Sequence, residues 1–166
     1  MREKILLMSA LCMVSSNLSA ENAIVIEQPT SPLKIETYTA EYERKSSYSR
    51  EGISHNVTLT NTSSQEVVAY RVTFNSFDVF NEDMGRGLGG ISIETIPVGG
   101  TTSGGWKQSP YAAFSFRGYG TGVAYVSEVR LADGTIWSFN QQRVLEELQK
   151  ISADLTAEIF EDGDGN

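Results

Sequence analysis

Cysteine, histidine and proline are scarce in this chain, and their scarcity limits the chemistry it can perform. The 166 residues include one cysteine (Cys12), one histidine (His55) and four prolines. A serine hydrolase needs a histidine beside its nucleophile, and the chain has no Gly-x-Ser-x-Gly elbow. A typical zinc site needs several His or Cys ligands. We therefore expect a non-enzymatic protein without catalytic residues, metal or cofactor, in which His55 is solvated at the surface or rim of a strand.

Long apolar runs are also missing, since a membrane-spanning helix needs about 20 apolar residues. The most apolar stretch, Ile5–Val14, follows a short basic start and precedes small and polar residues. This is the layout of a secretory signal. We expect residues 1–20 to be a signal peptide cleaved after Ala20, and a periplasmic or secreted protein. A retained membrane anchor or a lipid attached at Cys12 is the alternative interpretation.

Basic residues are outnumbered by acidic ones. Residues 21–166 contain 11 Lys and Arg against 20 Asp and Glu, a charge of −9, and no cysteine. Nucleic acid and anionic membranes attract basic surfaces, so neither is an expected partner, and no membrane insertion is expected. Without disulfides the domain must be held by its core, for which 146 residues suffice.

Period-two alternation of apolar and polar residues is the main structural signal that is present. It indicates strands with one buried and one solvated face, and hence two packed antiparallel sheets. We expect an extended leader at 21–32, in which 23–26 can add an edge strand, and a β-sandwich domain at 33–140. The expected strands are 33–42, 55–60, 67–80 with a bulge near Asn75, 91–96, and a hairpin of 123–131 with 135–139.

Glycine-rich segments separate these strands. Gly85–Gly90 has the letters of a dinucleotide-binding motif, but a strand-like segment follows it instead of a helix, so we expect a flexible turn. Residues 98–105 are likewise expected to be flexible. Asp133-Gly134 is expected to form a two-residue type I′ hairpin turn.

The segment after Asn140 changes period. Apolar residues recur at Val144, Leu148, Ile151, Leu155 and Ile159, a spacing of three or four that predicts an amphipathic helix over 141–160 with Asn140 as N-cap. This helix is expected to cover an open face or edge of the sheets, or to join a partner helix. Residues 161–166 are expected to form an acidic disordered tail.

One part of the strand pattern carries a family resemblance. Val57–Ser63 ends a strand in Asn-Thr-Ser, Val67–Phe80 is a long apolar strand with an Asp near its end, and Gly99-Gly100-Thr101 follows a proline turn. Residues 53–105 thereby resemble bacterial extracytoplasmic immunoglobulin-like modules of the FxLYD type. Phe77-Asp78-Val79-Phe80 departs from the Leu-Tyr-Asp order of that family. The resemblance implies an immunoglobulin-like sandwich with a binding or structural role, and no catalytic residue.

An aromatic stretch beside glycines is the candidate ligand site. Rings on a surface loop can stack against a sugar, a peptide or an aromatic ligand, and they can equally fold under the loop as a satellite core. The candidate residues are Trp106, Tyr111, Phe114, Phe116, Arg117 and Tyr119.

The sequence leaves three functions open. The first is an exported, non-catalytic binding or interaction module, and the second is a carbohydrate-binding or carbohydrate-active protein that uses the aromatic stretch. The third is a self-assembling structural subunit of the cell envelope. A protein partner or self-association is expected, with a small sugar or peptide as the other possible ligand. Acidic residues around Asp78 and Asp83 are the one catalytic alternative, as a glycosidase-type carboxylate pair.

Overall fold

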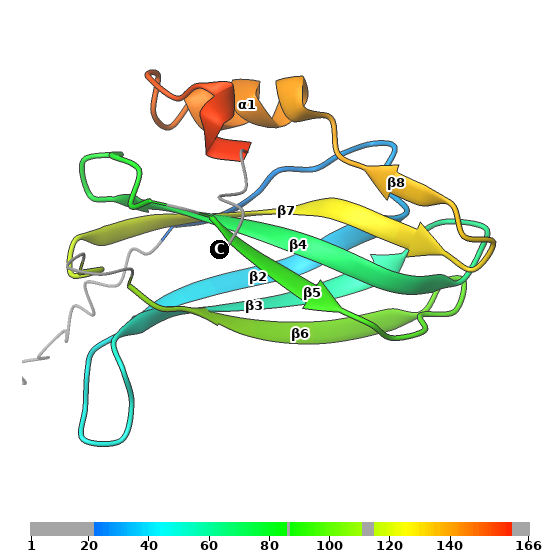
Figure 1. The fold of residues 1–166 in the computed structure, drawn as a ribbon, viewed down its shortest axis with the longest axis horizontal. Helices are drawn as coiled ribbons and strands as arrows, with labels where there is room; N and C mark the ends of the chain where they lie inside the picture. Colours follow the sequence, from blue (N-terminus) through cyan, green and yellow to red (C-terminus); the bar gives the residue numbers. More distant parts are fainter. Residues whose placement is uncertain (1–21, 86, 111–114, 161–166) are drawn as a thin grey trace, which may run out of the picture.

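Two β-sheets form the body of the protein (Figure 1), seen in a computed structural model that describes residues 22–85, 87–110 and 115–160. Neighbouring strands are antiparallel except for the first and seventh, which pair in parallel. The five-stranded sheet contains β1 (Asn22–Val25), β7 (Tyr119–Leu131), β4 (Val67–Asp78) and β5 (Leu88–Ser92) in that order, with β8 (Ile136–Ser138) also paired to β7. The three-stranded sheet contains β2 (Leu33–Glu43), β3 (Gly52–Asn61) and β6 (Thr101–Gln108) in that order.

The main core lies between the two sheets. Alternate residues of β4, such as Val72 and Phe74, face alternate residues of β3, such as Val57 and Leu59, and all four are buried. Complete burial of such a side chain contributes about 1.5–3 kcal/mol. The alternation thus correctly predicted a mainly β protein and the strands β2, β3, β4 and β7.

The shift of apolar phase within the first long strand is explained by a bulge. Leu33 and Ile35 are buried, and after a register shift between Ile35 and Thr37 the buried positions become Tyr38 and Ala40. A bulge lets two residues oppose one, so the next side chains change face.

A third layer covers part of the outer face of the five-stranded sheet (Figure 1). Helix α1 (Gln141–Gln149) buries Val144 and Leu148 against Phe77, Val123 and Tyr125. Asn140 caps the helix as expected, because its side chain accepts a hydrogen bond from the Arg143 N–H at 3.0 Å. None of the helices in the described part of the chain is long and apolar enough to cross a membrane.

This third layer removes the need for the bulge expected near Asn75. Residues 74–77 are all buried, but their pairing with β7 is regular, and the nearest register shift lies just after them, between Phe77 and Asp78, where the extra residue is Gly120 of β7. Phe74 faces the other sheet and Phe77 faces α1. Consecutive buried residues here reflect a strand that is covered on both faces.

The expected helix over 141–160 is too long. Helix α1 ends at Gln149 with Lys150 as C-cap, and only a short 3₁₀ turn, η1 (Ala157–Phe160), follows. Ser152 and Asp154 lie just after this end, and both residue types compete with helical hydrogen bonds through their own side chains. Ile151, Leu155 and Ile159 still pack onto the same cluster. The apolar spacing therefore predicted the buried face correctly and the helix length wrongly.

Glycine misled the prediction at three other places. Residues 98–105 are not a flexible loop, because β6 begins at Thr101, and β5 begins at Leu88 within the expected glycine-rich turn. The hairpin turn is not type I′, because Gly134 has a positive φ and Asp133 does not. The Gly134 N–H donates to the Leu131 carbonyl at 2.9 Å, which describes a three-residue loop with a glycine bulge.

Candidate functional site

The aromatic residues proposed as a stacking platform do not share an exposed face. Phe116 and Tyr119 are buried in the core between the sheets, and Trp106 packs against that core from β6. Arg117 is exposed, whereas Tyr111 and Phe114 lie outside the described residues. The described rings therefore serve as core, which is the alternative that the sequence left open.

Trp106 owes its position to two glycines. Its ring lies 5.7 Å from that of Phe74, centroid to centroid, at the margin of the core. A Cβ added to Gly90 of β5 would lie 2.5 Å from the indole, and one added to Gly104 would also collide with it. These glycines make room for the ring between the sheet edges, since a larger residue would have to displace it.

His55 is buried, which contradicts the solvated position expected from the sequence. It is fully inaccessible and lies two residues before Val57, on the same face of β3. Its ring stacks on Phe74 with centroids 4.6 Å apart. Burial lowers the pKa of His55 to about 4, and a hydrogen bond with Gln108 opposes this shift.

A short chain of polar groups forms hydrogen bonds with both imidazole nitrogens of His55. The Ser76 hydroxyl donates to Gln108 Oε1 at 2.9 Å, and His55 Nε2 lies 3.3 Å from the same oxygen. The imidazole therefore carries its proton on Nε2 and accepts from the Tyr38 hydroxyl at Nδ1, 2.9 Å away. Desolvation raises the pKa of Tyr38, so both groups are neutral. We assign this network to structure, because it is closed off inside the core.

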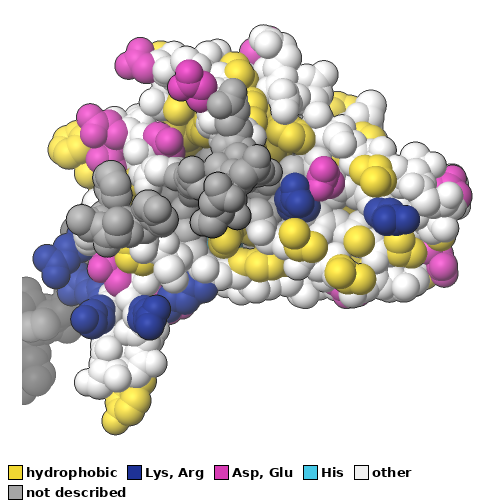
Figure 2. Space-filling view, in the orientation of Figure 1, with side chains coloured by type: hydrophobic (Ala, Val, Ile, Leu, Met, Phe, Trp, Pro, Cys, Tyr) yellow, Lys and Arg dark blue, Asp and Glu magenta, His cyan; other side chains and the backbone are white. Residues whose placement is uncertain are grey.

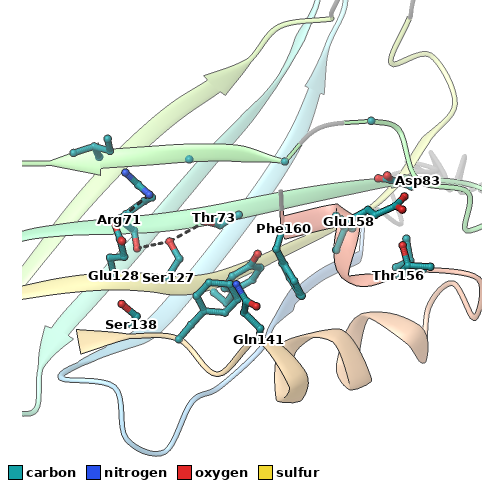
Figure 3. Close-up of a pocket in the computed structure, with 18 of the residues that line it drawn as sticks. Arg71, Thr73, Asp83, Ser127, Glu128, Ser138, Gln141, Thr156, Glu158 and Phe160 are labelled. Atoms are coloured by element: carbon teal, nitrogen blue, oxygen red, sulfur yellow. Dashed lines mark hydrogen bonds and ion pairs between the residues drawn. The ribbon is translucent and has the colours of Figure 1, made fainter. Parts of the chain in front are cut away.

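A large cleft lies on the outer face of the five-stranded sheet, under the C-terminal segment (Figure 3). Its volume is about 1060 Å³. The uncovered part of β4, β7 and β5 forms its floor, and residues 154–160 form one wall. This volume is at the upper end of the range of small-ligand sites.

The floor of the cleft is polar and ordered. The Thr73 hydroxyl donates to Ser127 Oγ at 2.9 Å, and Ser127 donates to the Arg71 carbonyl at 3.3 Å. The Arg71 guanidinium forms an ion pair with Glu128 at 3.1 Å (Figure 3). Ser138, Gln141 and Thr156 add hydroxyl and amide groups to the lining. Such a surface offers both donors and acceptors to an uncharged polar ligand.

One end of the cleft is apolar. The rings of Tyr125 and Phe139 lie 5.3 Å apart, and Phe160 meets Phe139 edge-on at the same distance. These rings belong to the cluster beneath α1 and are at least half-buried. Phe160 belongs to the C-terminal wall and Tyr125 to β7, so these contacts hold the wall against the sheet, because aromatic pairs have preferred geometries.

The charge of the lining is negative. Arg71 is its one basic residue among those described, while Glu128, Asp83, Asp154 and Glu158 are acidic. Desolvation raises the pKa of Asp83, and a hydrogen bond from the Gly85 N–H opposes this. An anionic ligand would be repelled here, so a neutral or cationic one fits better.

The acidic turn next to the cleft has a structural explanation for Asp78. Its carboxylate accepts the N–H groups of Phe80 at 2.8 Å and of Glu82 at 2.9 Å, and thereby caps the turn after β4. Asp83, by contrast, lines the cleft. Within the described residues, no group of three His, Cys, Asp or Glu side chains could hold a metal ion.

Sequence reasoning did not single out the cleft residues as a set. Arg71 and Thr73 occupy the polar positions of β4, which alternation marks only as outward-facing. These two residues lie in a cleft only because residues 154–160 pack over the outer face of the sheet and form its wall. The one usable signal was the apolar spacing beyond Leu148, which required that this segment pack somewhere.

Comparison with known proteins identifies a fold and no family. No family model and no curated protein matches the chain. A hypothetical protein of Peptoclostridium difficile 630 has a similar structure, with a TM-score of 0.51 and 12% identity over 74% of this chain and 92% of its own. An X-ray structure from the Northeast Structural Genomics Consortium gives a TM-score of 0.43 and 17% identity, covering 64% of this chain and 79% of its own. The first likeness concerns the fold alone.

Proposed function

We propose that this chain is an exported, non-catalytic binding module, built on an immunoglobulin-like sandwich, that binds an extended peptide segment beside β5. The cleft on the outer face of the five-stranded sheet is the binding site. The layout of residues 1–20 supports export, and the two packed, mainly antiparallel sheets support the immunoglobulin-like class.

The free edge of β5 is the observation that carries this proposal. β5 is the last strand of its sheet, and among the described residues no strand pairs with its outer edge. Natural edge strands are usually protected by charges, proline or a bulge. β5 has the sequence Leu-Gly-Gly-Ile-Ser, and its Ile91 is exposed. An unprotected edge of this kind is suited to strand addition.

The cleft reaches this edge. Gly85, Gly87, Gly89 and Ile91 all line it, so three of these four positions carry no side chain and Ile91 is the one apolar side chain among them. A strand added to β5 would place every second side chain over the outer face of the sheet, at the rim of the cleft. Asn75 lies beside Gly87, and its buried Oδ1 has no hydrogen-bond partner among the described residues. The negative lining favours peptides with Lys, Arg or uncharged polar residues.

Substitution of Gly89 by valine should test the site without harming the fold. A Cβ at Gly89 would meet only the Arg71 side chain, at an ordinary 3.5 Å, and valine favours strands. We expect peptides selected from a random displayed decapeptide library on the wild-type protein to bind Gly89→Val at least tenfold more weakly in fluorescence anisotropy. Ser103→Val, on the edge strand β6 outside the cleft, should bind them unchanged.

The outcomes of this selection separate the candidate functions. A cleft that takes glycans from a panel, loses them in Gly89→Val and selects no peptide would establish the carbohydrate-binding alternative. If light scattering instead shows oligomers that Gly89→Val dissociates, the edge of β5 joins copies of this chain and the self-assembling subunit is correct. Equal peptide binding by Gly89→Val and wild type would remove the cleft from the proposal.

A further inference from the structure

The hairpin between β2 and β3 differs in charge from the rest of the protein. Its loop, residues 44–51, contains Arg44, Lys45 and Arg50 and one acidic residue, Glu51, although the chain as a whole has a charge of −8. The Glu51 carboxylate accepts hydrogen bonds from Tyr42, Ser115 and the Phe116 N–H at the base of the hairpin. The three basic side chains are exposed, and the ion pairs among the described residues do not include them. The net charge therefore does not describe this end of the molecule.

Two further basic residues extend this surface at the base of the hairpin. Lys107 of β6 pairs with Glu43 and donates to Ser49 at 2.9 Å, which ties the hairpin to the sheet. Glu51, at the base of the hairpin, accepts hydrogen bonds from the Tyr42 hydroxyl at 3.0 Å and from the Phe116 N–H at 2.8 Å, and the exposed Arg117 follows Phe116 in the chain. We call Arg44, Lys45, Arg50, Lys107 and Arg117 the basic hairpin surface. Figure 2 shows Lys and Arg side chains gathered beside the projecting hairpin, with a hydrophobic side chain at its tip.

The tip of the hairpin presents an aromatic ring. Tyr48 is fully exposed, and it is held in a turn in which Ser46 Oγ accepts the N–H groups of Tyr48 at 3.2 Å and of Ser49 at 3.0 Å. The Ser46 N–H also donates to the Ser49 carbonyl at 2.9 Å. The turn thus fixes an amphipathic ring outward, beyond the basic residues on both sides of it.

We propose that the basic hairpin surface docks this protein onto an anionic lipid bilayer, with Tyr48 at the level of the headgroups. Tyrosine is enriched at the membrane interface, and basic residues near an anionic bilayer each strengthen binding. A projecting tip also suits a protein whose other surfaces are acidic. Electrostatic repulsion is screened over about 8 Å at physiological salt, so the tip can touch the bilayer while the acidic body stays away.

A protein partner fits this tip less well than a membrane does. A stable protein–protein interface takes about 800 Å² from each partner, which corresponds to about 20–30 residues on a side. The loop has eight residues, 44–51, and its only large apolar side chain is Tyr48. A fluid bilayer needs no shape complementarity and accepts a single ring among basic side chains. This docking is independent of the cleft beside β5.

The test measures binding to vesicles. The protein is purified as the expressing cell produces it from the full-length chain, and is sedimented with vesicles of pure phosphatidylcholine or with 30% phosphatidylglycerol. We expect binding to the anionic vesicles only, and a loss of that binding as NaCl is raised. Replacing Arg44, Lys45 and Arg50 together by glutamine should lower the partition coefficient about a hundredfold, because each basic residue contributes about fivefold.

A matched control removes the same charge elsewhere. Lys34, Arg130 and Lys150 are outside the basic hairpin surface, and their joint replacement by glutamine should leave partitioning within about twofold of wild type, since the local charge is intact. Tyr48→Ser should weaken binding at every salt concentration. Equal losses in the two triple variants, equal binding to neutral vesicles, or binding of polyglutamate in place of vesicles would each overturn the proposal.

Discussion

Acidification from pH 6.5 to 4.5 should destabilise this protein through one residue, His55. The folded state holds the pKa of His55 at about 4, whereas an unfolded histidine titrates near ~6.5. Below pH ~6.5 the unfolded chain therefore binds a proton that the folded chain does not bind, and the free energy of unfolding decreases as the pH is lowered. The difference between these pKa values corresponds to a loss of about 3 kcal/mol that is complete below pH ~4.

The other titrating groups act mainly outside this window. Hydrogen bonds lower the pKa of Asp133, and the hydrogen bonds of Lys107 and Ser54 lower that of Glu43, so their stabilisation is present above pH ~4.5 and lost below it. Asp83 has the opposite effect on stability. Its pKa is raised in the folded state, so on acidification the folded protein binds this proton at a higher pH than the unfolded chain does. His55 is the only histidine, and Asp83 acts in the opposite direction, so His55 accounts for a fall in stability on acidification above pH ~4.5.

Urea unfolding at a series of pH values measures this slope. His55→Phe should keep the stacking on Phe74 and lower stability at pH 6.5 and above, since Tyr38 and Gln108 lose a partner, but its stability should be flat between pH 6.5 and 4.5, so that its deficit against wild type shrinks on acidification. Asn56→His places an exposed histidine on the same strand and should leave the wild-type slope unchanged. In NMR spectra, an imidazole of wild-type protein that titrates near pH 6.5 would contradict the buried position.

The sequence was informative wherever burial follows a simple period. The strands around Val57 and Val72 have one buried and one solvated face, so alternation marks them directly. The same rule, counted correctly, places His55 with Val57 and Leu59 on the buried face, so the prediction of a solvated His55 misapplied the alternation. A buried polar residue is readable only when its partners are known, and Tyr38, Ser76 and Gln108 come from three other strands.

Glycine explains most of what the sequence did not predict. Gly90 and Gly104 lie within strands. Glycine occupies these two positions because the Trp106 ring fills the space that a side chain would need. Such a requirement lies in tertiary packing and leaves no trace in hydropathy or in strand propensity. β5 was therefore missed along most of its length, and with it the unprotected edge beside the cleft. The cleft itself arises from the return of residues 154–160 over the sheet, which local sequence does not encode.

Truncation of Leu148 should detach the third layer from the sheets. Leu148 is fully buried and packs in the cluster that contains Phe77, Val123 and Tyr125. A Leu→Ala change at such a position costs about 2–5 kcal/mol, because the apolar contacts are lost and a cavity remains. Leu145 lies on the same helix but is only half-buried, and Leu145→Ala should cost less than about 1 kcal/mol.

This pair of variants also connects stability with the cleft. Residues 154–160 form a wall of the cleft and are held by the cluster that Leu148 anchors. In urea unfolding, Leu148→Ala should therefore lose several times more stability than Leu145→Ala. Under conditions where both remain folded, Leu148→Ala should also bind the selected peptides more weakly. Equal stability of the two variants would mean that α1 does not pack on β4 and β7 as described. A Leu148→Ala protein that binds peptide like wild type would show that the C-terminal wall takes no part in recognition, and would confine the site to the edge of β5 and the sheet beneath it.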